Sequence, residues 1–69
     1  MRLSTRNQLS ATVTEVRHGE VTTIVKVRLG DGQTITSSIT KEAAEELDLA
    51  PGDEIVVLIK SSEVMLGKE

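Results

Sequence analysis

Residues 9 to 16 read Leu-Ser-Ala-Thr-Val-Thr-Glu-Val, in which apolar and polar side chains alternate until the phase slips by one position. An alternation with period two is typical of a β-strand that buries one face. After Val13 the next apolar residue is Val16 and not Glu15. An extra residue inserted into the strand explains such a slip, so we expect a β-bulge near Thr14 and Glu15.

Further strands are predicted on the C-terminal side of this segment. Val21 to Leu29 and Gln33 to Thr40 alternate in the same way, and Gly30-Asp31-Gly32 between them is typical of a hairpin turn. Glu54 to Lys60 is apolar on both faces, which indicates a strand covered on both sides. Val64 to Leu66 predicts a short fifth strand.

One helix is expected, over Lys41 to Asp48, with Thr40 in the N-cap position. Its apolar stripe is narrow and consists of Ala43, Ala44 and Leu47. The expected order of three strands, one helix and two further strands is that of a small OB-like barrel. The sequence therefore predicts a mainly β fold, a five-stranded OB-like barrel with one short helix after the third strand, and a single domain over residues 1–69.

The composition restricts the stability and the partners of the chain. A domain of 69 residues buries little surface, and the lack of cysteine and the single His18 exclude disulfides and a zinc site. We therefore expect a homo-oligomer in a reducing cytoplasm. The absence of aromatic residues and the net charge of −3 argue against nucleic-acid binding, and no apolar run is long enough to span a membrane.

Three hydroxyl-rich segments are the candidate functional residues: 4–8, 34–40 and 60–62. They hold many small hydrogen-bond donors and two fixed cations, Arg6 and Lys60, which suits a small oxyanion. Each segment also has an ordinary interpretation. The first can be a solvated lead-in to a strand. Lys60 can be a side chain that reaches from a buried strand to water, and threonines are good strand formers in any case.

Other chemistry finds little support in the sequence. The acidic residues around the helix have helical spacing and form a solvated face rather than a calcium loop. No base–nucleophile pair or cluster of metal ligands stands out, so we expect neither an enzyme nor a metal-cation site.

The chain resembles the molbindins, small molybdate- or tungstate-binding proteins with a single Mop-type (TOBE) domain. The resemblance covers nearly the whole length and is carried by segments 4–9, 32–40, 44–47 and 59–65 in the family's order. It implies strands shared between neighbouring chains, a hexamer arranged as a trimer of dimers, and oxyanion sites at the subunit interfaces. No covalent cofactor is implied, and molybdate or tungstate is the ligand.

The family's binding pattern is carried over position by position. It implies oxyanion ligands at Ser4, Arg6, Thr40, Lys60 and Ser61. Relatives often carry a hydroxyl three residues after this threonine, where this chain has Ala43. Weaker candidates are Thr5, Asn7, Gln8, Ser37, Ser38 and Ser62.

The resulting hypothesis is an intracellular, non-catalytic store or buffer of molybdate or tungstate. Two alternatives remain. Residues 49–57 are also similar to swapped-hairpin transcription factors, which would make the protein a DNA-binding regulator. The same module also occurs in sensors, in which case it would act on a separate partner protein.

Overall fold

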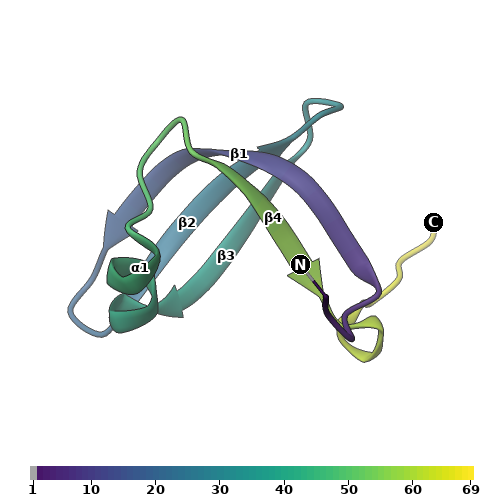
Figure 1. Cartoon of the computed structure of the whole chain (residues 1–69). Helices are drawn as coiled ribbons and strands as arrows, with labels where there is room; N and C mark the ends of the chain where they lie inside the picture. Colours follow the sequence, from purple (N-terminus) through teal and green to yellow (C-terminus); the bar gives the residue numbers. More distant parts are fainter. Residues whose placement is uncertain (1) are drawn as a thin grey trace.

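The computed structural model describes residues 2–69, which form one curled antiparallel sheet with a short α-helix and a 3-10 helix (Figure 1). The strands lie in the order β3-β2-β1-β4. This confirms a mainly β chain with one short helix after the third strand. In chain order the elements are β1 (Asn7–His18), β2 (Thr22–Leu29), β3 (Thr34–Thr40), α1 (Lys41–Leu47), β4 (Glu54–Ile59) and η1 (Ser61–Glu63).

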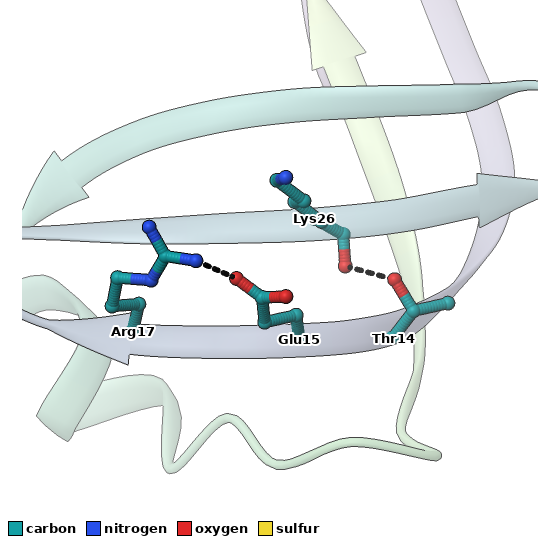
Figure 2. Close-up of polar contacts among 4 residues, drawn as sticks. All are labelled: Thr14, Glu15, Arg17 and Lys26. Carbon is teal, nitrogen blue, oxygen red and sulfur yellow. Dashed lines mark hydrogen bonds and ion pairs between the residues drawn. The ribbon is translucent and has the colours of Figure 1, made fainter.

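The long strand β1 joins the two sides of the sheet, because its first half pairs with β4 and its second half with β2. Its register with β2 shifts between Val13 and Glu15, which confirms the predicted bulge. Thr14 is the extra residue, and its hydroxyl donates to the carbonyl oxygen of Lys26 at 3.1 Å (Figure 2). The bulge allows Val13 and Val16 to contact the same core despite their odd spacing.

The core lies on one face of the sheet, which we call the inner face, and it is small. The buried apolar residues of the described chain are all alanines and valines, and one of them, Ala44, lies in the helix. Thr23 is also fully buried, and its hydroxyl is hydrogen-bonded to Nδ1 of His18 at 3.1 Å. Full burial of a valine side chain contributes about 1.5–3 kcal/mol, so few such residues leave a chain of this length marginally stable.

Both ends of α1 are defined by capping interactions. The backbone N–H of Ala43 donates to Oγ1 of Thr40 at 3.0 Å, which confirms Thr40 as the N-cap. Asp48 takes a left-handed backbone conformation with φ 50° and ends the helix at Leu47, one residue before the predicted end.

A tight turn over residues 50–53 fixes the start of β4. Gly52 has φ 98°, which only glycine adopts without strain, and its N–H donates to the carbonyl oxygen of Val13 at 2.8 Å. In return, the N–H of Val13 donates to the carbonyl oxygen of Asp53 at 2.8 Å. The turn therefore holds the bulged part of β1 against the beginning of β4.

The prediction of a fifth strand over residues 64–66 is wrong for the isolated chain. After η1 the backbone leaves the sheet, and the C-terminal segment extends away from it (Figure 1). Val64, Met65 and Leu66 are 45%, 92% and 94% exposed. The segment is apolar, as the prediction assumes, but the described part of its own chain does not cover it.

The inner face of the sheet remains hollow. A cavity of about 580 Å³ lies between β3 and β4, the two edge strands of the sheet. Most of its lining is aliphatic, and Ser37 is a hydroxyl-bearing residue within it. The barrel suggested by the sequence is therefore open between β3 and β4.

The hairpin between β2 and β3 contains a carboxylate whose ionisation is coupled to folding. Asp31 accepts hydrogen bonds from the backbone N–H and the side-chain amide of Gln33, at 3.0 and 2.6 Å, and these bonds lower the pKa of Asp31 below 3.8. The stabilisation is therefore fully present above pH 3.8 and is lost as pH falls through the lowered pKa. We expect Asp31→Ala to lower the free energy of unfolding slightly at pH 6. In urea titrations the difference from the wild type should shrink as the pH falls below 3.8, and an unchanged difference would contradict this role.

Candidate functional site

Eight of the candidate residues gather at one end of the sheet, which we call the strand-end cluster. The N-terminal segment leads into β1 there, and β4 ends beside it and continues into η1 (Figure 1). The members are Ser4, Thr5, Arg6, Asn7, Gln8, Lys60, Ser61 and Ser62. Segments that lie more than fifty residues apart in the sequence are thus neighbours in the fold.

The β1–β4 register places the two cations of this cluster next to each other. The last pair of the ladder is Asn7 with Ile59. Arg6 immediately precedes β1 and Lys60 immediately follows β4, so both residues lie just beyond this last pair. Neighbouring strands of a sheet lie about 5 Å apart, so the two chain segments are close together where the ladder ends. The long side chains of Arg6 and Lys60 are therefore within reach of one small ion.

Within residues 2–69, neither cation forms an ion pair with a carboxylate. The one ion pair found over residues 2–69 joins Arg17 to Glu15 at 2.9 Å and lies on β1, away from the cluster (Figure 2). Arg6 and Lys60 are both exposed. Two like charges held close together repel each other, and an anion between them removes that repulsion. The cluster also supplies neutral donors in Ser4, Ser61 and the backbone, which suits an oxyanion.

The remaining candidates lie elsewhere in the fold. Thr40 ends β3 and pairs with Thr22 at the start of β2, and its side chain caps α1. Ser38 is exposed on the same strand, whereas Ser37 is half-buried and lines the inner cavity. We call Ser37, Ser38 and Thr40 the helix-start group.

The helix-start group and the strand-end cluster lie at opposite ends of the sheet. Arg6 precedes the first residue of β1, while the last residue of β1, His18, pairs with Thr23 beside the end of β3. β1 spans 12 residues. At about 3.3 Å per residue the contour of this curved strand is roughly 36 Å, and Figure 1 shows its two ends at opposite sides of the sheet. A tetrahedral oxyanion therefore does not contact Arg6 and Thr40 of the same chain.

Other kinds of site find no support in the part of the chain that the structure describes. Residues 2–69 contain no group of three or more acidic, histidine or cysteine side chains placed to hold a metal ion. None of the helices in this range is both long and apolar enough to cross a membrane. The stretch 49–57, which suggested a DNA-binding hairpin, forms the turn and the strand β4, and β4 pairs with β1 of its own chain.

Comparison with known proteins gives a consistent result. The family model described as TOBE domain matches residues 3–66. A probable molybdenum-pterin-binding protein of Haemophilus influenzae is 38% identical over 69 residues, which is the full length of both chains. The molybdenum-pterin-binding protein MopA of Rhodobacter capsulatus is 50% identical over 66 residues. The chain spans only 25% of the length of MopA, so it corresponds to one part of that larger protein.

Solved structures resemble the chain over nearly its whole length. A molybdate-binding protein from Sporomusa ovata superimposes with a TM-score of 0.93 at 35% identity, covering 99% of this chain and 100% of the other. The cytoplasmic molybdate-binding protein ModG, solved with molybdate bound, gives a TM-score of 0.92 at 46% identity. That match covers 97% of this chain and 48% of ModG.

Proposed function

Since the chain belongs to the TOBE domain family, we propose that it binds molybdate, and also tungstate, as a non-catalytic oxyanion store or buffer. The relatives that support this proposal are named as molybdenum-pterin- or molybdate-binding proteins, and ModG is described as cytoplasmic. We place this protein in the cytoplasm as well. We take the free oxyanion as the ligand, because the chain has no aromatic side chain on which a pterin ring would stack.

The observation that carries the proposal is the position of Arg6 and Lys60. They lie just beyond the end of the β1–β4 ladder, among hydroxyl groups and without a carboxylate partner among residues 2–69. Molybdate and tungstate are tetrahedral dianions, so two cations nearly match the ligand charge. Neutral donors from Ser4 and Ser61 complete a short-range cage, which acts even though the net charge of the chain is −3.

We further propose that a second copy of the chain completes the site. Thr40 lies at the far end of its own sheet, so it reaches an oxyanion at Arg6 and Lys60 only from a neighbouring protomer. A shared strand provides a physical reason for such contact. Segment 64–66 is apolar and exposed, and the cavity between β3 and β4 is lined mainly by aliphatic side chains. If this segment of one chain inserts into the cavity of a partner chain, it closes the partner's barrel. A hexamer built as a trimer of dimers is the assembly we expect.

Titration calorimetry with molybdate tests the proposed function directly. We expect saturable binding of molybdate and tungstate, much weaker binding of sulfate and phosphate, and no heat with a free pterin. Sulfate and phosphate have shorter bonds, so a cage of fixed donors fits them less well. A protein that is folded and oligomeric yet gives no heat with molybdate or tungstate would refute the proposal.

A further inference from the structure

Asn7 forms a side-chain hydrogen bond that links the start of β1 to the backbone at the end of β4. Its side-chain Nδ2 donates to the backbone carbonyl oxygen of Ile59 at 3.1 Å, which links residues 52 positions apart in the sequence. Asn7 is half-buried, whereas Arg6 and Lys60 are exposed. The residue that precedes Asn7 is Arg6, and the residue that follows Ile59 is Lys60. The hydrogen bond therefore joins the two segments one residue away from each cation.

A second bond fixes the backbone on the other side of Arg6. Nε2 of Gln8 donates to the carbonyl oxygen of Thr5 at 2.9 Å, which closes a short loop around Arg6. Arg6 lies outside the β1–β4 ladder, so no pairing with β4 restrains its backbone. The two side-chain amides restrain the segment that carries the guanidinium.

We infer that Asn7 is a positioning residue of the oxyanion site, which sets Arg6 and Lys60 at the separation that a tetrahedral dianion requires. This inference rests on the proposed function. One N–H of the Asn7 amide is engaged by the carbonyl oxygen of Ile59, so the inferred role is to hold the backbone rather than to bind the ion. A site whose cations are exposed and flexible gains affinity when the backbone beneath them is fixed, because less conformational entropy is lost on binding.

The test is a double-mutant cycle on molybdate affinity, measured by titration calorimetry on the full chain. Asn7→Ala should weaken binding about fivefold, the amount expected for one hydrogen bond. In an Arg6→Gln background the same substitution should weaken binding only about twofold, because only one of the two cations that it positions remains. Asn7→Ser, which keeps a short polar side chain at this half-buried place, provides a second variant if Asn7→Ala does not fold.

Thr14→Val is the matched control for lost stability. Thr14 lies on the same strand and also donates a side-chain hydrogen bond of 3.1 Å to a backbone carbonyl, that of Lys26 (Figure 2). We expect both variants to lower the thermal unfolding midpoint, while only Asn7→Ala changes the affinity. An equal loss of affinity with and without Arg6, or no loss in the wild-type background, overturns the positioning role. Absence of molybdate binding by the wild type is a separate result, which refutes the proposed function itself.

Discussion

Arg6→Gln is expected to weaken molybdate binding by about 100-fold, and Lys60→Gln by a similar factor. A hydrogen bond to a charged group contributes up to about 3 kcal/mol, which corresponds to a factor of about 100 in affinity. Glutamine keeps a polar side chain of comparable length and removes the charge. Because both cations are exposed and form no ion pair within residues 2–69, the thermal unfolding midpoint of the protein without ligand should stay within a few degrees of the wild type.

Arg28→Gln is the control for this experiment. It removes one positive charge from an exposed position on β2, outside the strand-end cluster. Its affinity for molybdate should stay within about twofold of the wild type, since charges beyond roughly 10 Å are screened by salt. Equal losses in Arg28→Gln and Arg6→Gln would mean that only the overall charge matters, and would contradict a defined site.

Removal of residues 64–69 is expected to break the oligomer into monomers. The three apolar residues 64–66 are exposed in the isolated chain, and burying each in a partner contributes roughly 1.5–3 kcal/mol. That sum is comparable to the whole stability of a small domain, so the unfolding midpoint should fall by at least about 10 °C. Light scattering should find the mass of a single shortened chain, somewhat below the 7.5 kDa of the 69-residue chain, instead of six times the single-chain mass.

A shorter deletion separates the apolar segment from the chain end. Removing only Gly67, Lys68 and Glu69 leaves residues 64–66 in place and takes away one charge of each sign. This variant should keep the oligomer mass and the unfolding midpoint of the full chain. If both deletions leave the oligomer intact, residues 64–66 do not form the shared strand.

The features that the sequence predicted well are those fixed by neighbouring residues. The one-residue slip between Val13 and Val16 located the bulge, because the alternation of side chains across a strand has a strict period of two. Thr40 was predicted as a helix cap because the cap bond spans only three residues. The glycine at position 32 marked the hairpin and has φ 91° in the structure.

The features that the sequence did not predict depend on contacts between distant segments. Residues 64–66 were assigned to a strand from their apolar character, but a strand also needs an edge to pair with, and they pair with none in the described part of their own chain. Arg6 and Lys60 were each selected as candidates by composition, whereas their proximity follows from the β1–β4 register. The same holds for the bond between Asn7 and Ile59, which no local pattern indicates.

Locating the bound ion tests the central claim most directly. Crystals grown with molybdate should be measured at the molybdenum absorption edge, where anomalous scattering marks the metal alone. We predict a peak between Arg6 and Lys60 of one protomer, within hydrogen-bond reach of Ser4 and Ser61 and facing Thr40 of a neighbouring protomer. A peak in the inner cavity, or at a surface without Arg6 and Lys60, would contradict the proposed site.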